Sequence, residues 1–500
     1  MKKRLKAFLT GLLLCVTLAG SLSVNAAAAG FQDVPANHWA ASSIQRCVEH
    51  GFFKGQSADR FGLGQQMTRS AFTVVLCRFF GWETTSPTKA TYGDVPVDAW
   101  YAGAVESAYN HGAITDQREH FRPNDPITRE ELTVMLVRAM GYGTIAGLAQ
   151  DLELPFKDVT TNVGYITMAY DLGLVNGTTA TTFSPDKTAT REQVAVILMR
   201  LYDKLHGEAP ETVAIVSSSM ELTGLDVAAI PAGRLICVSG KPVINSAMQG
   251  EEVTPLLEAV RQSGAQALLH VTGSSTALNG DAVKTADVLV EAVASGGYDG
   301  LFLNIPTLSV KKASVLTKLV KAVDAALGDK PLYVVAEAPT RQGKAYGGYD
   351  YTALAAAADH LVLRTASYEK TSTSFTTAPV DPLEEIYYAL GSLHDGIDSS
   401  KLTLMVTTTP SAWSGKSSYR LTAEEFDTLL ADQNTEFYYS DRYACAYLTG
   451  TSQNKKDLVV WYLDGRASAA RSQLARAFGV GQFCLTDWEA ASQEVLSGLQ

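Results

Sequence analysis

Beyond its first 24 residues, the 500-residue sequence lacks any hydrophobic run long enough to cross a membrane. It also lacks an excess of positive charge, because 41 Lys and Arg against 52 Asp and Glu leave a net charge of −11. This balance argues against nucleic-acid binding through a basic surface. Hydrophobic residues make up 46% of the chain and charged residues 19%, which excludes a disordered or fibrous protein. At about 150 residues per domain, we expect two to four domains.

Cysteine is scarce and shows no paired spacing. Beyond the first 30 residues the cysteines are odd in number, widely spaced and set among apolar residues: Cys47, Cys77, Cys237, Cys445 and Cys484. We therefore expect small core side chains and not a disulfide framework. The sequence has no His-Glu-x-x-His or Cys-x-x-Cys motif, so it predicts neither a zinc site nor a cofactor.

The N-terminus has the layout of a secretion signal. Lys2, Lys3 and Arg4 precede an apolar run from Ala7 to Val24, and small residues around Ala26 offer a cleavage site. We expect a signal peptide over residues 1–26 and no membrane segment after its removal. An uncleaved membrane anchor is the alternative, but the apolar run is short and small residues follow it.

A pattern repeated three times organises the first 206 residues. Each copy opens with an aromatic residue followed by x-Asp-Val, at Phe31, Tyr92 and Phe156. An amphipathic stretch ending at a glycine follows, then a phenylalanine, and eight residues later an arginine that opens a second helix. The three arginines are Arg69, Arg129 and Arg191. Such helix–turn–helix units cannot bury their apolar faces alone, so we expect them to pack together.

The position of these arginines suggests a ligand. A threonine precedes each one and is a good N-cap, and Glu131 and Gln193 complete capping boxes in the second and third copies. An arginine at the first helical position gains nothing from the helix dipole. Beside free N–H groups it makes an anion site, which is our interpretation of its three occurrences. The alternative is an ordinary surface charge.

These features resemble S-layer homology repeats, with copies at residues 31–82, 92–142 and 156–205. The resemblance implies an all-α bundle of three repeats, a pseudo-trimer, that binds secondary cell wall polysaccharide, often pyruvylated, and holds a secreted protein on the bacterial cell wall. Residues implied to bind it are Arg69, Arg129, Arg191, Trp39 and Trp100. The third copy has Gly164 and Tyr165 where the family has tryptophan, and the first has Ala71 in place of an acid, so the second copy is the most intact.

After a polar linker at residues 206–211, the pattern changes to alternating strands and helices over residues 212–500. Eight short β-branched or apolar runs are separated mostly by helical stretches, which predicts an α/β domain of the (β/α)8 TIM-barrel class. The expected strands are 213–216, 235–238, 267–271, 301–305, 332–335, 361–363, 402–406 and 483–485. A doubly wound open sheet is the alternative, without a Gly-x-Gly-x-x-Gly after its first strand. Residues 436–447 and 458–463 suggest a β insertion before the last helix.

This half resembles family-18 glycoside hydrolases, which cleave N-acetylated glycans such as chitin or peptidoglycan. The resemblance lies in residues 297–301, 351–365 and 460–464. The family's motif Asp-Gly-x-Asp-x-Asp-x-Glu falls on residues 299–306, where Asp299 is kept but Phe302, Asn304 and Pro306 replace the other acids. Proline cannot donate a proton, so general acid catalysis worth about 10²–10⁴ is lost.

Two other carboxylates are candidates for a relocated acid. Glu337 ends the fifth predicted strand, and Asp487 follows the eighth. Arg364, at an inward position by resemblance, would pair with Glu337 and keep its carboxylate charged, the wrong state for a proton donor. We therefore expect a Glu337–Arg364 ion pair in a cleft that also contains Asn304 and Asp487.

Three functions remain open from the sequence. In the first, which we favour, the repeats anchor the protein to the wall and a non-catalytic barrel binds peptidoglycan, another N-acetylated glycan or a partner. In the second, the barrel is an active glycosidase with a relocated acid such as Glu337. In the third, the protein is a structural surface-layer component and the barrel is a spacer.

Overall fold

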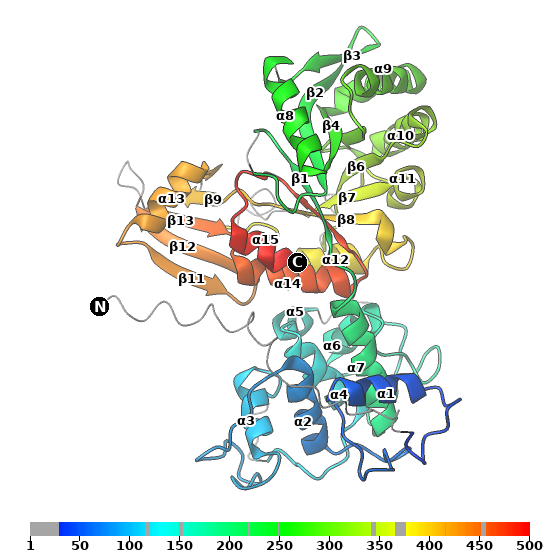
Figure 1. Cartoon of the computed structure of the whole chain (residues 1–500), viewed down its shortest axis with the longest axis vertical. Helices are drawn as coiled ribbons and strands as arrows, with labels where there is room; N and C mark the ends of the chain where they lie inside the picture. The colour runs from blue at the N-terminus through cyan, green and yellow to red at the C-terminus, as the bar shows by residue number, and fades with distance from the viewer. Residues whose placement is uncertain are drawn as a thin grey trace.

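The computed structural model describes residues 30–115, 120–149, 154–218, 221–248, 250–341, 347–365, 377–415, 417–451 and 457–500. Figure 1 shows a helical N-terminal part in blue and cyan, a barrel in green to red, and an orange β-rich insertion beside the barrel. The expected signal peptide lies outside the described residues. Within the described ranges, no helix is long and apolar enough to cross a membrane.

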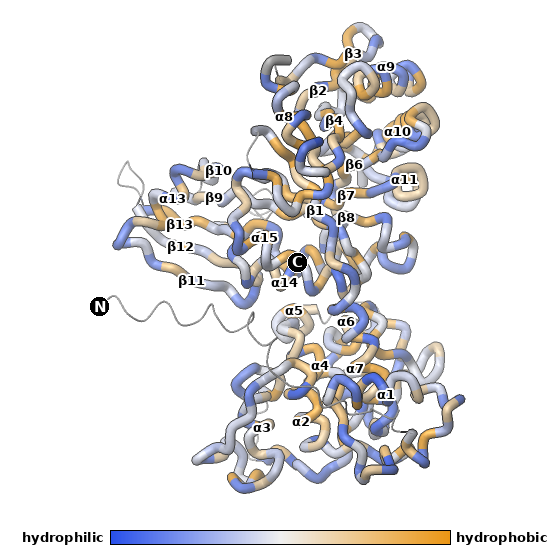
Figure 2. Tube along the Cα trace, in the orientation of Figure 1, coloured by the Kyte–Doolittle hydropathy of each residue, from blue (hydrophilic) through white to orange (hydrophobic). Residues whose placement is uncertain are grey.

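The N-terminal part is helical. Its described helices are α1 (Ala41–Glu49), α2 (Arg69–Phe80), α3 (Ala102–Asn110), α4 (Arg129–Ala139), α5 (Gly143–Leu148), α6 (Val163–Asp171) and α7 (Arg191–Leu205). The capping box predicted for α4 is confirmed: Thr128 Oγ1 accepts from the Glu131 N–H at 3.2 Å, and the Glu131 carboxylate accepts from the Thr128 N–H at 3.1 Å. In Figure 2, hydrophobic stretches run along α2 and α4.

Three backbone hydrogen bonds join the repeats in a closed ring. The Met67 N–H donates to Ala189 O at 2.9 Å, the Ala189 N–H to Ile127 O at 2.9 Å, and the Ile127 N–H to Met67 O at 2.8 Å. All three residues are buried. Each residue precedes the Thr-Arg step of its own repeat, so the ring places the starts of α2, α4 and α7 around one point.

The aspartate that opens each repeat organises the turn before its second helix. Backbone N–H groups donate at 2.7–2.8 Å from Phe61 to Asp33, from Phe121 to Asp94 and from Phe183 to Asp158. The residue after each phenylalanine has a positive φ of 60–91°, so the turn bends back sharply in all three copies. Burial acts to raise the pKa of Asp33, but hydrogen bonds from the Leu63, Phe61 and Gly62 N–H groups outweigh it and lower that pKa.

The C-terminal half is a closed barrel, which confirms the (β/α)8 prediction and makes the open-sheet alternative wrong. Eight parallel strands pair in sequence, and β1 pairs with both β2 and β14. They are β1 (Glu211–Ile215), β2 (Val227–Val238), β4 (Gln266–Gly273), β5 (Gly300–Asn304), β6 (Leu332–Glu337), β7 (His360–Arg364), β8 (Leu402–Val406) and β14 (Gln482–Leu485). The antiparallel β3 (Lys241–Ser246) extends β2.

Helices accompany the barrel strands, and apolar side chains fill the interior. The helices are α8 (Gly250–Ser263), α9 (Ala282–Ser295), α10 (Ala313–Leu327), α11 (Tyr351–Ala357), α12 (Leu383–Gly391), α14 (Gly465–Ala477) and α15 (Gln493–Leu499), with short 3₁₀ turns η1 (Ser275–Asn279), η2 (Val310–Lys312) and η4 (Ser399–Lys401). Phe302, Tyr333, Val362 and Met405 form part of the inner cluster. Four of the five described cysteines are buried as predicted, Cys237 is half-buried, and none of them forms a disulfide.

The second barrel strand is longer than the sequence indicated. The prediction covered residues 235–238, whereas β2 begins at Val227. Pro231 and Gly233 lie within it and normally weaken a strand. The pairing of β2 with β4 shifts register between Ile230 and Gly233, and this irregularity accommodates both residues.

The β insertion is also larger than predicted. It forms a five-stranded antiparallel sheet made of β9 (Ser411–Ser414), β10 (Ser417–Arg420), β11 (Glu436–Ser440), β12 (Cys445–Thr451) and β13 (Asp457–Tyr462), with α13 (Ala423–Ala431) against one face. It lies between β8 and α14, directly before the helix that the sequence indicated as the last one, and the short helix α15 follows. The short, exposed strand β10 gave no clear alternating pattern in the sequence.

Polar contacts connect the helical part to the barrel. The Lys204 ammonium at the end of α7 donates to Ala477 O at the end of α14 at 2.7 Å. The Tyr387 hydroxyl of α12 donates to the Asp171 carboxylate of α6 at 2.8 Å. Burial raises the pKa of Asp171 to about 6, although the Tyr387 hydrogen bond acts to lower it.

The raised pKa of Asp171 predicts a pH-dependent effect on stability. Above about pH 6, the folded protein holds an ionised carboxylate that is better solvated in the unfolded chain, so this group destabilises the fold as pH rises from about 4. We expect Asp171→Asn to raise the melting temperature more at pH 7.5 than at pH 4.5. Asp203→Asn is the control of opposite sign, since a hydrogen bond from Arg46 lowers the pKa of Asp203. An equal effect of Asp171→Asn at both pH values would contradict the prediction.

Candidate functional site

The three arginines singled out in the sequence hold the repeats together. Each donates from Nε to the carbonyl oxygen of the phenylalanine in the next repeat, and the third repeat returns to the first. The bonds measure 2.9–3.0 Å and join Arg69 to Phe121, Arg129 to Phe183, and Arg191 to Phe61. The same phenylalanine N–H groups donate to the opening aspartates, so each of these residues is fixed on both sides.

Further contacts immobilise these guanidinium groups. They lie 4.5–5.0 Å from the centres of the same phenylalanine rings, within range for a cation–π interaction. Arg129 Nη2 also donates to Asn176 O at 2.6 Å, and Arg191 Nη2 donates to Lys54 O at 2.8 Å. Burial lowers the pKa of Arg129 and of Arg191, while nearby carboxylates act to raise both. Their position at the helix starts therefore has a structural cause, and their contact with an acidic sugar stays a prediction.

The two predicted tryptophans lie on the surface. Trp39 is 63% exposed just before α1, and Trp100 is 69% exposed just before α3. This exposure contradicts the alternative that they are core residues. Neither side chain lines the groove described next.

A groove of about 570 Å³ runs between the repeats, and it contains charges of both signs. Its charged lining residues are Arg69, Arg122, Arg138, Glu130, Glu131 and Asp186. Glu131 pairs with Arg122 and, at 3.0 Å, with Arg69. Burial acts to raise the pKa of Glu131, but the Thr128 N–H and the two arginines outweigh it and lower that pKa. Of the three predicted arginines, Arg69 is the one that lines this groove.

Arg138 is a groove residue that the sequence analysis missed. Its Nε donates to the Tyr165 hydroxyl at 3.3 Å, and its guanidinium lies 5.1 Å from the centre of that ring. In the described part of the chain, its two terminal nitrogens have no hydrogen-bond partner. The repeat pattern contained a signal, because an arginine follows nine residues after each Thr-Arg arginine, at Arg78, Arg138 and Arg200.

At the barrel mouth, the fourth strand β5 carries no carboxylate on its inward positions. Phe302 is fully buried inside the barrel, and Asn304 is 7% exposed at the end of the strand. Pro306 follows the strand, half-buried. Asp299 precedes β5, and its carboxylate accepts from the Ala267 N–H at 2.8 Å, which holds the start of the strand.

Two buried polar side chains in this region have no partner. Asn304 Oδ1 and both ring nitrogens of His270 are inaccessible to solvent and make no hydrogen bond to any residue that the structure describes. The His270 ring lies 5.1 Å from Phe302, edge to face. Burial, and then the charge of Arg364, lower the pKa of His270 to about 4, so the ring is neutral at pH 7. The positive charge of Arg364 therefore disfavours a second positive charge on His270 inside the barrel.

The predicted ion pair between Glu337 and Arg364 is wrong. The two residues are register neighbours on β6 and β7, but no nitrogen–oxygen distance between their side chains is within 4.0 Å among the described ion pairs. The Glu337 carboxylate instead accepts from the Thr307 N–H at 3.2 Å. Thr307 has a φ of 59°, and this left-handed turn after β5 brings its N–H to the carboxylate.

The other candidate acid, Asp487, is next to a second carboxyl group. Burial and a hydrogen bond with Glu489 raise the pKa of Asp487. Glu489 Oε1 accepts from the Ser217 and Ser218 N–H groups at 2.9 and 2.6 Å, so the negative charge of the pair rests on Glu489. Trp488 between them is buried, and its Nε1 donates to Glu221 O at 2.8 Å.

Comparison with known proteins identifies the repeats. Residues 30–73, 91–133 and 155–195 match the S-layer homology domain. The chain is 31% identical over 180 residues to an amylopullulanase of Thermoanaerobacterium thermosulfurigenes, across 35% of this chain and 10% of the relative. It is 30% identical over 226 residues to an S-layer protein of Bacillus thuringiensis subsp. finitimus, across 44% of this chain and 26% of that protein. The chain thus matches 10% and 26% of the length of these two relatives.

The barrel is similar to solved chitinases. A chitinase from Chromobacterium violaceum superposes with a TM-score of 0.51 at 15% identity, over 58% of this chain and 98% of that one. A class V chitinase from Pseudomonas fluorescens Pf-5 superposes with a TM-score of 0.50 at 17% identity, over 58% of this chain and 100% of that one. At this identity the likeness shows the fold alone. The S-layer homology domains and the S-layer relatives indicate a location at the cell surface, on the cell wall.

The contacts of Arg129 predict a structural effect. Arg129→Ala removes the donors to Phe183 O and to the exposed Asn176 O, and leaving the carbonyl of the buried Phe183 unpaired should lower the free energy of unfolding by about 2 kcal/mol. Thermal or urea unfolding of the full chain measures this loss. Arg78→Ala, at an exposed position of α2, is the matched control and should have no effect. If Arg129→Ala is as stable as Arg78→Ala, the structural role assigned to the arginine contacts is wrong.

Proposed function

We propose that the protein is anchored to the bacterial cell wall by its three repeats and carries a non-catalytic barrel that binds a glycan or a partner. S-layer homology domains bind cell-wall polysaccharide, and the three matches in this chain support the anchoring role. The absence of a carboxylate at the inward positions of β5 supports the second part. On this proposal the polysaccharide bound is the acidic secondary wall polymer, and the repeats form one three-part helical unit.

The groove between the repeats is the proposed polysaccharide site. Arg138 lines it, and its terminal guanidinium nitrogens have no partner among the described residues; a guanidinium binds a carboxylate through two parallel hydrogen bonds. Arg69 and Arg122 also line the groove, and both are ion-paired with Glu131. The Arg129 and Arg191 side chains contribute by holding the repeats in register, and the exposed Trp39 and Trp100 provide flat surfaces outside the groove.

For the barrel, the proposal rests on one observation: no carboxylate lies on the inward positions at the end of β5. A family-18 hydrolase protonates the leaving oxygen from the position that Pro306 occupies here, and Phe302 fills the interior two residues before Asn304. Asn304 Oδ1 has no hydrogen-bond partner among the described residues, and a turn of this side chain at the end of β5 would offer it to a hydroxyl or amide donor of a ligand. Glu337, Arg364 and Asp487 complete a polar set at the strand ends, suited to binding an N-acetylated glycan or a peptide.

A hydrolytic function is the second candidate, and one observation favours it. Asp487 has a raised pKa beside the charged Glu489, which is the arrangement of a proton donor next to a carboxylate. Glu337 is a weaker candidate, because its carboxylate accepts from the Thr307 N–H. A spacer role for the barrel is the third candidate.

The anchoring proposal predicts that Arg138 matters for retention. We expect Arg138→Ala to weaken binding of the full chain to isolated Bacillus cell walls about tenfold, because a free guanidinium donor pair is lost. Co-sedimentation with the walls at increasing protein concentration measures the affinity. Arg78→Ala occupies the equivalent position of the first repeat and should bind like the unaltered protein. If the two variants bind equally well, the assignment of Arg138 to the polysaccharide site is wrong.

The barrel proposal predicts no turnover. The purified full chain should release no reducing sugar from peptidoglycan or chitin oligosaccharides, because β5 supplies no acid. Glu337→Gln and Asp487→Asn, assayed alongside, should give the same baseline. Turnover that disappears in either variant would establish the hydrolytic candidate and identify its acid.

A further inference from the structure

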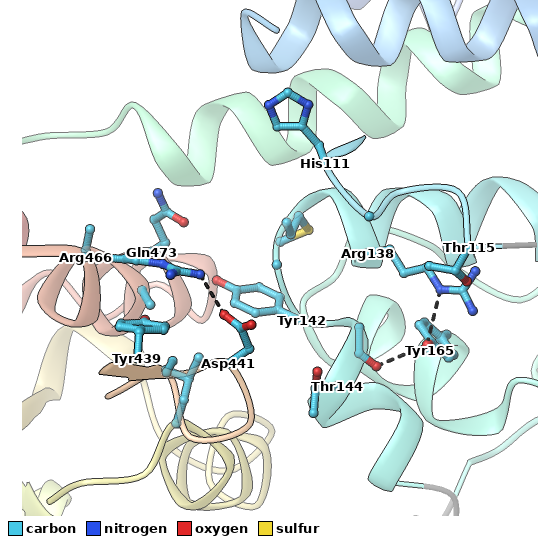
Figure 3. A pocket seen from close by; sticks show the side chains of 18 of the residues that line it. His111, Thr115, Arg138, Tyr142, Thr144, Tyr165, Tyr439, Asp441, Arg466 and Gln473 are labelled. Carbon is cyan, nitrogen blue, oxygen red and sulfur yellow. Dashed lines mark hydrogen bonds and ion pairs between the residues drawn. The ribbon is translucent and has the colours of Figure 1, made fainter. Parts of the chain in front are cut away.

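A second and larger cavity lies between the repeats and the barrel. It has a volume of about 760 Å³ and is open to solvent on one side. Figure 3 shows that the loop after α3 and the segment from α4 to α5 form one wall, and that the β insertion and α14 form the other. Clefts at domain boundaries are common places for ligand sites. The described contacts around this cleft point to a particular kind of ligand.

Each wall presents an arginine on an aromatic ring. Arg138 lies against Tyr165 on the side of the repeats, with its terminal nitrogens free of partners in the described chain. On the barrel side, the Arg466 guanidinium lies 3.7 Å from the centre of the Tyr439 ring and donates to Asp441 at 2.7 Å. Asp441 therefore offsets the charge of Arg466, and the charge of Arg138 has no such counterpart in this cleft.

A buried hydroxyl at the cleft wall is also unpartnered. Tyr142 is 2% exposed, and its hydroxyl makes no hydrogen bond. In Figure 3 its ring extends from the end of α4 toward the wall that carries Arg466 and Asp441. Because this hydroxyl is inaccessible to solvent, Tyr142 shapes the wall of the cleft through its ring and offers a ligand no hydrogen bond.

The cleft and the groove between the repeats are neighbours. Arg138 and Thr115 line both. A linear ligand that occupies the groove can therefore pass Arg138 and reach Tyr439 and Arg466 of the barrel half. The two arginine–tyrosine stacks and the charge of Arg138, which no described carboxylate of this cleft offsets, fit a carboxylate-bearing saccharide chain.

We propose that this cleft is an extension of the wall-polysaccharide site, in which Tyr439 and Arg466 of the barrel half bind the part of an acidic saccharide chain that emerges from the groove. The inference rests on the proposed function. It gives residues of the barrel half a direct part in anchoring. This role is separate from the ligand proposed for the strand ends at the barrel mouth. Residues from both halves then contact one chain, so binding also holds the two halves together.

The test measures the affinity of the full chain for polysaccharide released from Bacillus cell walls and separated into short and long fragments. Arg466→Ala and Tyr439→Ala should weaken binding of long fragments about tenfold and leave short fragments unchanged. Arg138→Ala should weaken both. Arg442→Ala is the matched control, since Arg442 is exposed, close by in sequence and outside the cleft lining. Gln473→Ala, at another exposed lining position, replaces Arg466→Ala if that variant does not fold.

The outcomes separate the two proposals. If long fragments bind Arg466→Ala and Tyr439→Ala as tightly as the unaltered protein, while Arg138→Ala still weakens short fragments, the cleft extension is wrong and the groove stands. If the unaltered protein binds neither fragment, the anchoring function itself fails. Long fragments whose carboxylates have been reduced to alcohols should lose the Arg466 dependence. Retention of that dependence would overturn the assignment of an acidic ligand.

Discussion

The hydrogen bond from an arginine Nε to a phenylalanine carbonyl of the next repeat is the contact on which the N-terminal half depends. A unit of two short helices has no core of its own, and stability comes from the junctions. At each junction a buried phenylalanine has its N–H held by an aspartate of its own repeat and its C=O held by an arginine of the preceding one. The ring through Met67, Ile127 and Ala189 closes only when all three junctions form.

Because the first arginine of each repeat is used in these contacts, we expect the saccharide to bind at other residues. Arg129 donates to the carbonyl of the buried Phe183 and to that of the exposed Asn176, so fewer of its donors are left for a ligand. Arg138 is two and a half turns further along the same helix, outside the junction, and its terminal nitrogens are free in the described chain. A repeated sequence position therefore need not mark the binding residue: the first arginine of each copy has a structural task, and we propose the second as the binding residue in the copy where it lines the groove.

The sequence predicted the parts of the fold that have a strong local period. The Thr-Arg helix starts and the barrel strands, as at Leu402–Val406, were found because each combines a cap or a β-branched run with a clear boundary. The start of β2 was missed because Pro231 lies in it, and only the register shift against β4 makes that tolerable. The Glu337–Arg364 pair was wrong because neighbouring strand positions do not fix side-chain partners. The left-handed turn at Thr307, not visible in the sequence pattern, gives Glu337 a different partner.

The barrel interior bears on the choice between a binding domain and a spacer. Asn304 Oδ1 and the ring nitrogens of His270 are buried without partners, and each such group costs about 1–3 kcal/mol. An inert spacer gains stability when these side chains are replaced by apolar ones of similar volume, as Phe302 already shows at the neighbouring inward position. A binding role gives a reason to keep a polar side chain at the end of β5, as at Asn304, that a spacer role does not give. This argument favours a barrel that binds, with or without the ability to cleave.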